Sequence, residues 1–146
     1  FGAGYSLTEG VVDSSGDTSA AHWGELMSTA ARGRGCRGVV IDGATRDVAQ
    51  LLEMGFPAFV RYRSPASSIR RWRISGYGHA GRLGGVLVRQ GDFIVGDAVG
   101  VGVVPDEMAE DVLLDVEALA GAETTMRAEL LRGDLFSAAF DRHRVG

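Results

Sequence analysis

The chain is poor in cysteine and has no long apolar run. Cys36 is the single cysteine among 146 residues, which excludes an internal disulfide framework and a cysteine-built zinc site, and we expect its side chain to pack in the core. No apolar run approaches the ~20 residues of a membrane-spanning helix, and the N-terminus lacks the basic and then apolar pattern of a signal peptide. We therefore expect a soluble cytoplasmic protein without a membrane partner.

An excess of positive charge is also lacking. The formal net charge is -4 and the pI is about 5.3, so no global positive field favours nucleic acid or a membrane surface. We expect no nucleic-acid partner unless a local basic patch provides one. A hydrophobic content of 45% over this length is enough for one core, and we predict a single domain across residues 1–146.

In the first half of the chain, short apolar runs alternate with helical spacing. A strand is predicted at 10–13, a helix from a cap at Thr18 or Ser19 to Gly33, a strand at 38–42, a helix at 46–54 and a strand at 58–62. The order β-α-β-α-β predicts an α/β domain with partly parallel strands. In such folds, ligands bind beyond the carboxyl ends of strands.

The second half changes character. Glycine-containing turns separate three short predicted strands, at 84–89, 93–96 and 101–104, which we interpret as a β-meander. Pro105 opens a long amphipathic helix. A last short helix is predicted at 135–140.

Three charged residues follow the apolar run at 39–41: Asp42, Arg46 and Asp47. Buried charges are normally paired, solvated or bound to a ligand. One interpretation is structural: Asp47 supports the positive N-terminus of its helix, and Arg46 pairs with Asp42 or Glu25. The other is a ligand site, in which Arg46 and the helix N-terminus bind a carboxylate while Asp47, flanked by Glu25, holds Mg²⁺ or Mn²⁺. Asp42 then supports the site by orienting Arg46 or the turn.

One basic segment stands out, between residues 61 and 73. Its members are Arg61, Arg63, Arg70, Arg71, Trp72 and Arg73. Arginine interleaved with an aromatic side chain can contact RNA. Pairing of these arginines with the acidic helix or with a neighbouring subunit is the interpretation that we favour, because the rest of the chain is not basic.

Four stretches carry a resemblance to a known family: HWGELMSTAARGRGCRGVVIDGATRD, GFPAF, GGVLVRQGDFIVGD and GVGVVP. In this order they resemble the RraA-like family, which includes 4-hydroxy-4-methyl-2-oxoglutarate/4-carboxy-4-hydroxy-2-oxoadipate aldolases and the regulator of ribonuclease activity A. The most specific element is an acidic residue, twenty intervening residues and then Arg-Asp, here Glu25 and Arg46-Asp47. The family has several dozen more residues before the point matching Val11, so we expect the family's N-terminal segment to be lacking here.

The resemblance implies a swivelling β/β/α-type α/β domain with a mixed sheet, assembled as homotrimers or hexamers with active sites at subunit interfaces. It implies that Asp47 binds Mg²⁺ (or Mn²⁺), that Glu25 reaches the metal through water, and that Arg46 binds the carboxylate of a small 2-keto acid. The substrate-binding backbone amides would be those of Gly24, Glu25, Leu26 and Met27.

The implied function is that of a metal-dependent class II aldolase, a lyase that cleaves 4-hydroxy-2-keto acids to pyruvate and also decarboxylates oxaloacetate. Both reactions pass through the same enolate, whose charge a divalent metal stabilises. The alternative is a non-catalytic regulator that binds a ribonuclease or an RNA-processing complex, as the family's regulator members do. In that case the arginine segment would carry the function.

Overall fold

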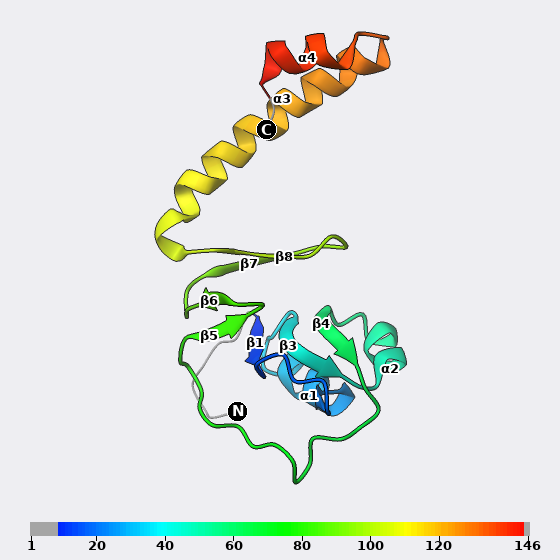
Figure 1. Ribbon diagram of the computed structural model, residues 1–146, viewed down its shortest axis with the longest axis vertical. Coiled ribbons are helices and arrows are strands. Elements are labelled where there is room, and N and C mark those ends of the chain that lie inside the picture. The colour runs from blue at the N-terminus through cyan, green and yellow to red at the C-terminus, as the bar shows by residue number, and fades with distance from the viewer. Residues whose placement is uncertain (1–8, 145–146) are drawn as a thin grey trace. The chain divides into compact units, whose positions relative to one another are not determined.

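The computed structural model describes residues 9–144, and these divide into two compact units, with the boundary between Val103 and Val104. The first unit holds a parallel sheet with two helices and two β-hairpins, and the second is a helical hairpin (Figure 1). The prediction of a single domain across residues 1–146 stays a prediction.

The strand β3 (Val39–Thr45) is the centre of the main sheet. On one edge it pairs in parallel with β4 (Ala58–Arg63). On the other edge β1 (Gly10–Asp13) and β2 (Ala21–Trp23) pair in parallel with successive stretches of it. The predicted strands at 10–13, 38–42 and 58–62 are therefore confirmed. Because the strands are parallel, β2, β3 and β4 end at the same edge of the sheet, where Arg46 and Asp47 follow β3.

The predicted helix start at Thr18 or Ser19 is wrong. Ser19 donates its backbone N–H to Asp17 Oδ1 at 3.1 Å and its hydroxyl to Asp17 Oδ2 at 3.0 Å, which closes a turn instead of a helix. Trp23, which we assigned to the helix, ends β2, and α1 (Glu25–Arg32) follows it. Residue 23 has the apolar spacing of α1, but it pairs with β3 and is therefore part of a strand.

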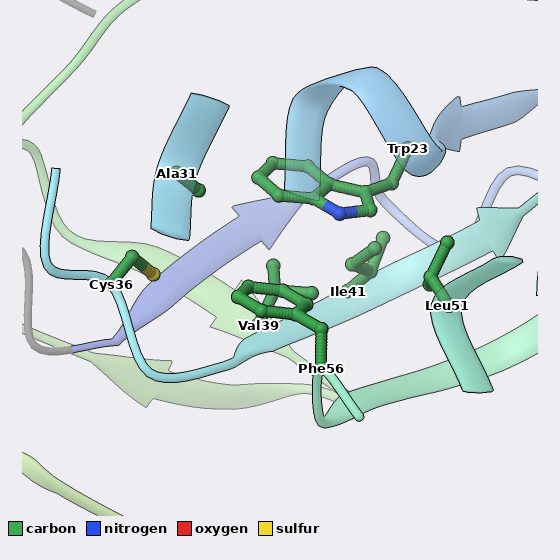
Figure 2. Packing of buried hydrophobic residues seen from close by; sticks show 7 residues of the cluster. All are labelled: Trp23, Ala31, Cys36, Val39, Ile41, Leu51 and Phe56. Atoms are coloured by element: carbon green, nitrogen blue, oxygen red, sulfur yellow. The ribbon is translucent and has the colours of Figure 1, made fainter. Parts of the chain in front are cut away.

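One face of the main sheet carries the apolar core together with α1 and α2 (Val48–Glu53). Its buried members are Trp23, Ala31, Cys36, Val39, Ile41, Leu51 and Phe56 (Figure 2). Cys36 packs here as predicted, with its thiol 3.1 Å from the carbonyl oxygen of Gly38. Strand alternation places Val39 and Ile41 on this face and turns Asp42 to the opposite face.

The opposite face is covered by β structure. The strands β5 (Gly81–Leu83) and β6 (Val86–Val88) form an antiparallel hairpin, and β7 (Phe93–Gly96) pairs with β8 (Val101–Val104). The predicted meander is wrong in its pairing, because β6 takes as its partner β5, a three-residue strand too short to show a pattern. Gly84, in the β5–β6 turn, donates its N–H to Asp42 Oδ2 at 3.2 Å and so ties this hairpin to β3.

The second unit consists of α3 (Ala109–Leu131), after a short 3₁₀ turn at Asp106–Met108, and α4 (Phe136–His143). Both predicted C-terminal helices are present, but the amphipathic character predicted for the first is wrong, because the apolar side chains of α3 are spread around the helix. Met126 is the one described residue of α3 that is buried. The apolar side chains on α3 that stay exposed include Leu113, Leu114, Val116 and Leu119. Within residues 9–144, no helix combines the length and the apolar character needed to cross a bilayer.

Two neighbouring leucines of α2 provide a matched test of the core. Leu51 is 5% exposed and belongs to the core cluster, whereas Leu52 is 75% exposed. We expect Leu51→Ala to lower the free energy of unfolding by about 2–5 kcal/mol, because it removes buried apolar surface and leaves a cavity. Leu52→Ala should change it by less than about 0.5 kcal/mol. Denaturant unfolding measures both, and equal effects would contradict this core.

The helical hairpin should loosen in acid. Arg142 donates to Glu129 Oε2 at 2.7 Å, and His143 Nε2 lies 3.1 Å from the same oxygen. The hydrogen bond from Arg142, followed by that from His143, lowers the pKa of Glu129 from its ordinary value of 4.5. A carboxyl group with a lowered pKa stabilises the folded form above its unfolded pKa, and this contribution is lost as the pH falls through the folded pKa.

We therefore expect amide exchange in α4 to accelerate between neutral pH and about pH 3, beyond the intrinsic pH dependence of exchange. Glu129→Gln should remove this acid-induced loosening. Glu123→Gln is the control, because the Glu123–Arg127 pair is 3.8 Å long and exposed, and it should leave the loosening in place. A Glu129→Gln protein that still loosens in acid would contradict the assignment.

Candidate active site

Arg46 and Asp47 lie between the end of β3 and the start of α2, at the carboxyl edge of the parallel sheet. Asp47 has φ 56° and ψ 40°, in the left-handed region. This conformation costs a non-glycine residue roughly 1–2 kcal/mol. Its side chain makes no capping hydrogen bond to α2, so the structural interpretation, in which Asp47 supports its own helix, is not what the contacts show.

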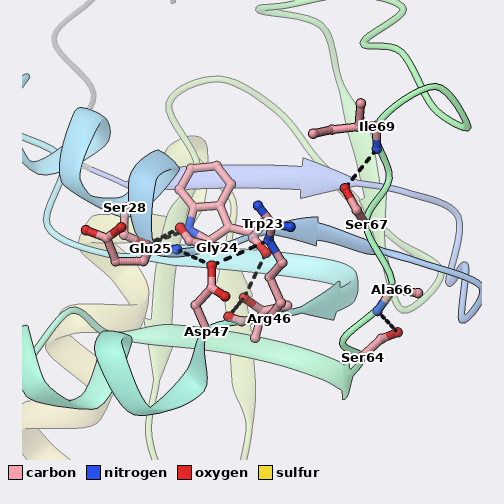
Figure 3. Close-up of polar contacts among 11 residues, drawn as sticks. Trp23, Gly24, Glu25, Ser28, Arg46, Asp47, Ser64, Ala66, Ser67 and Ile69 are labelled. Carbon is pink, nitrogen blue, oxygen red and sulfur yellow. Dashed lines mark hydrogen bonds and ion pairs between the residues drawn. The ribbon is translucent and has the colours of Figure 1, made fainter.

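The carboxylate of Asp47 instead reaches the N-terminus of the preceding helix. Asp47 Oδ2 accepts the backbone N–H of Glu25, the first residue of α1, at 3.1 Å, and lies 3.4 Å from Nε of Arg46 (Figure 3). A helix N-terminus carries partial positive charge, which stabilises a carboxylate there. The side chains of Arg46 and Asp47 are 39% and 36% exposed, so the pair remains open to a ligand.

Gly24 makes this approach sterically feasible. A Cβ atom at residue 24 would lie 2.6 Å from Asp47 Oδ2 and 3.1 Å from Cγ of Arg46. Gly24 itself has an extended backbone, which any residue can adopt. The requirement for glycine is therefore one of space: the side chains of Arg46 and Asp47 lie over its Cα atom.

Glu25 was predicted to act through both its backbone N–H and its carboxylate, and in the structure these two groups face different partners. The backbone N–H faces Asp47, but Oε1 accepts the hydroxyl of Thr29, one turn along α1, at 2.9 Å. In Figure 3 the Glu25 carboxylate extends away from Asp47. A water-mediated contact from Glu25 to a metal at Asp47 would therefore need a change of rotamer.

The predicted substrate-binding amides lie in the first turn of α1. Helix geometry leaves the N–H groups of Leu26 and Met27 without an acceptor inside the helix, whereas the N–H of Glu25 is already bound by Asp47. Leu26 is 74% exposed, so the start of α1 is accessible. The structure thus brings Gly24, Glu25, Arg46 and Asp47 together, next to the two remaining amides.

Three further residues, Trp23, Ser28 and Thr45, support the site, and their spacing did not predict this role. The indole of Trp23 donates to Ser28 Oγ at 2.7 Å, and Ser28 Oγ in turn donates to the carbonyl oxygen of Gly24 at 3.1 Å. Thr45 Oγ1 lies 3.3 Å from the carbonyl oxygen of Trp23, which also accepts the N–H of Arg46 at 3.1 Å. These buried bonds fix the strand end against the start of α1. Only one of these contacts has a sign in the sequence: Ser28 lies four residues after Gly24, one helical turn away. This spacing is a weak signal.

Asp42 does not orient Arg46, contrary to our expectation. Its buried carboxylate forms an ion pair with Nε of Arg61 and accepts the N–H of Gly84. Asp42 follows the strand alternation of β3 and therefore points to the face away from the core. Register across the sheet, which a sequence does not reveal, decides that Arg61 rather than Arg46 is its partner.

The residues present at the site fit a divalent cation that keeps most of its water. Asp47 Oδ2 is bonded to the protein, and no described residue donates to Oδ1. Among residues 9–144 there is no group of three or more His, Cys, Asp or Glu side chains arranged around an ion. Mg²⁺ typically takes one or two carboxylates together with water and substrate oxygens, whereas structural zinc needs a full set of protein ligands.

The arginine segment lies on the surface. All its arginines are exposed, and within the described part of the first unit only Arg61 forms an ion pair, with Asp42. Ala21, in β2, donates its N–H to the carbonyl oxygen of Ala66 at 2.7 Å. This hydrogen bond connects the arginine segment to the main sheet. The ring of Trp72 meets His22 edge-on with a centroid separation of 5.0 Å and remains 46% exposed.

The structure is thus an α/β domain in which an Arg-Asp pair and a helix N-terminus lie together at the carboxyl edge of a parallel sheet. The RraA-like family model, described as Aldolase/RraA, matches residues 10–103. The chain belongs to the RraA-like family, as the sequence stretches indicated.

Three similar proteins place the chain more closely. A Halalkalibacterium halodurans protein named "Putative 4-hydroxy-4-methyl-2-oxoglutarate aldolase" is 39% identical over 103 residues, 70% of this chain and 49% of that protein. An uncharacterised Pseudomonas syringae protein of known structure has a TM-score of 0.85 at 28% identity, covering 90% of this chain and 66% of that chain. Streptomyces coelicolor RraAS2, described as an unusual member of the RNase ES inhibitor RraA protein family, has a TM-score of 0.76 at 26% identity, covering 83% and 62%.

These similarities confirm the predicted RraA-like α/β fold. The chain spans about half the length of the curated relatives it matches. The family contains both a protein named for aldolase activity and proteins named for ribonuclease inhibition.

Two glycines of the α1 region provide a test of the site geometry. A Cβ at residue 24 would contact Asp47 at 2.6 Å, whereas a Cβ at Gly33 would meet only backbone oxygens, at 3.5 Å or more. We expect Gly24→Ala to lower the free energy of unfolding by about 1–3 kcal/mol, because Asp47 and Arg46 must move. Gly33→Ala, in a right-handed helical conformation, should be neutral or stabilising by up to about 1 kcal/mol.

Thermal unfolding measures both changes. Amide chemical shifts of Glu25 and Asp47 should move in Gly24→Ala and stay in place in Gly33→Ala. Undisturbed shifts in Gly24→Ala would mean that the side chains do not lie over residue 24.

Proposed function

We propose that the protein is a divalent-metal-dependent lyase that cleaves 4-hydroxy-2-keto acids to pyruvate and decarboxylates oxaloacetate. The observation that carries the proposal is the position of the Asp47 carboxylate. It is bonded to the N-terminal amide of α1, it lies beside the guanidinium of Arg46, and it is partly exposed at the edge of the sheet. The name of the similar Halalkalibacterium protein supports the aldolase part of the proposal.

In this proposal Arg46 binds the carboxylate of the keto acid. Its Nε faces Asp47, which leaves the terminal guanidinium nitrogens for two parallel hydrogen bonds to the substrate. The amides of Leu26 and Met27 add donors from the helix N-terminus. These hydrogen bonds would hold the substrate in one orientation, so that the C–C bond to be broken is correctly positioned.

Asp47 is the residue that would hold Mg²⁺ or Mn²⁺. The cation would supply charge stabilisation at the keto oxygen as the enolate develops in either reaction. Asp47 is kept in position by the N–H of Glu25 and by the absence of a side chain at Gly24. Glu25, after leaving Thr29, is the nearest carboxylate on α1 that could accept or return a proton through water.

A coupled assay tests the activity. Release of pyruvate from oxaloacetate and from 4-hydroxy-4-methyl-2-oxoglutarate is followed with lactate dehydrogenase, with Mg²⁺ or with EDTA. We expect Mg²⁺-dependent release that falls at least about 100-fold in Asp47→Ala, because that variant loses the metal ligand. Arg46→Lys should mainly raise KM, because the point charge of lysine replaces a bidentate fork.

Glu53→Ala is the matched control. Glu53 is an exposed carboxylate at the end of the same helix, α2, and its loss should leave turnover unchanged. Full activity of Asp47→Ala, or activity that survives EDTA, would contradict the proposal.

A second candidate function is regulation of a ribonuclease or an RNA-processing complex by binding. The observation in its favour is the exposed set Arg63, Arg70, Arg71 and Arg73 around Trp72, without ion pairs in the described part of its unit. The description of the Streptomyces relative as a member of an RNase ES inhibitor family points the same way. An RNA-degradation assay separates the two functions: inhibition that is lost on replacing these arginines, without pyruvate release, would favour the regulator.

A further inference from the structure

A cavity of about 450 Å³ lies on the face of the main sheet that is turned away from the core cluster. Four charged side chains line it, Asp13, Asp42, Arg61 and Arg82, together with the turn at 15–16 and Gly85. Neither residue of the Arg46-Asp47 pair lines this cavity. Asp13 and Asp42 are neighbours on the paired strands β1 and β3, and they form its floor.

The acidic oxygens of the cavity already have partners: three accept a backbone N–H, and Asp42 Oδ1 forms an ion pair. Asp13 Oδ1 accepts the N–H of Ser15 at 2.9 Å, and its Oδ2 accepts the N–H of Arg82 at 2.7 Å. Asp42 Oδ2 accepts the N–H of Gly84 at 3.2 Å, and its Oδ1 pairs with Nε of Arg61. A cation would have to displace these donors, so the two carboxylates serve to hold the cavity wall and the arginines.

The hydrogen-bonding capacity that remains consists mainly of donors. Arg61 uses Nε for Asp42, and Arg82 uses Nη1 for the carbonyl oxygen of Gly85 at 2.7 Å. A guanidinium has five N–H donors. The other nitrogens of both side chains have no acceptor among residues 9–144. The ion pair with Asp42, whose side chain is 7% exposed, restricts the Arg61 side chain, so less side-chain entropy is lost when it binds a ligand.

The β5–β6 turn lets the chain come close to these donors. Gly84 and Gly85 have φ of 61° and 87°, a conformation that favours glycine. A Cβ at residue 84 would lie 3.5 Å from the terminal nitrogen of Arg61. The turn thus brings Arg61, from β4, and Arg82, from β5, to one opening.

We propose that this cavity binds a small oxyanion, a phosphate or carboxylate group of a metabolite, between Arg61 and Arg82. Guanidinium groups bind both kinds of group through paired hydrogen bonds. The inference goes beyond the lyase proposal, because it concerns other residues on another face of the sheet.

The test is titration of the whole protein with inorganic phosphate and, separately, with malonate. Calorimetry reports affinity at constant ionic strength, and the amide signals of Gly84 and Gly85 report location. We expect saturable binding of at least one anion in the millimolar range or tighter, with shifts at these two amides. Arg82→Gln should weaken it about tenfold or more.

Three further variants make the result decisive. Arg61→Gln should also weaken binding, but it leaves Asp42 buried without its partner, so Arg82→Gln is the primary variant. Arg89→Gln replaces an exposed arginine outside the cavity and should bind like the wild type. Arg46→Gln should leave the anion-induced shifts at Gly84 and Gly85 unchanged, which separates this site from the proposed active site.

Phosphate binding that depends on Arg82 supports the proposal and identifies the ligand group as a phosphate. Malonate binding that depends on Arg82 supports it and identifies the group as a carboxylate. Absence of binding for both anions overturns it. Shifts at Gly84 and Gly85 that are unchanged in Arg82→Gln, or that are lost in Arg46→Gln instead, also overturn it. Because Arg46→Gln and pyruvate release report on the other site, failure of either proposal leaves the other one standing.

Discussion

The candidate site depends on the contact between two chain junctions, the one from β2 into α1 and the one from β3 into α2. The carbonyl oxygen of Trp23 accepts the N–H of Arg46, and the N–H of Glu25 binds the carboxylate of Asp47. Each junction thus completes the hydrogen bonding of the other. Since both strands are parallel neighbours in one sheet, their ends meet at one edge, and the contact follows from the topology.

This contact has a chemical consequence. The left-handed backbone at Asp47 and the missing side chain at Gly24 allow a carboxylate to lie over a helix N-terminus while an arginine lies next to it. In the proposed function, Arg46 would bind the carboxylate of a 2-keto acid, and a metal held by Asp47 would bind its keto oxygen. The buried bonds of Ser28 and Thr45 keep the two junctions in position.

The main elements of the fold were predictable because their signals are local. The apolar run at 39–41 predicted the central strand, and glycine and proline near residue 55 predicted the end of α2. The strand β2 was missed because its residues share the spacing of the helix that follows, and only pairing with β3 distinguishes them. The pairing of β5 with β6 was missed for a similar reason, since three residues are too few to show alternation.

Within the site, the sequence predicted which residues gather but not how each side chain is bonded. Glu25, Arg46 and Asp47 do lie together, yet the Glu25 carboxylate bonds to Thr29, and Asp42 bonds to Arg61. Partners chosen across a sheet depend on register and on the strand face, and partners one helical turn apart depend on rotamers. Neither can be obtained from spacing along the chain.

The central claim is that Asp47 holds a divalent cation where Arg46 holds a carboxylate. The most direct measurement is the electron paramagnetic resonance of Mn²⁺ titrated into the protein with and without oxalate, which resembles the planar enolate of pyruvate. The account predicts that oxalate tightens Mn²⁺ binding in the wild type, that Arg46→Gln abolishes this tightening, and that Asp47→Ala abolishes binding itself. Mn²⁺ binding that is equal in the wild type and in Asp47→Ala would contradict it.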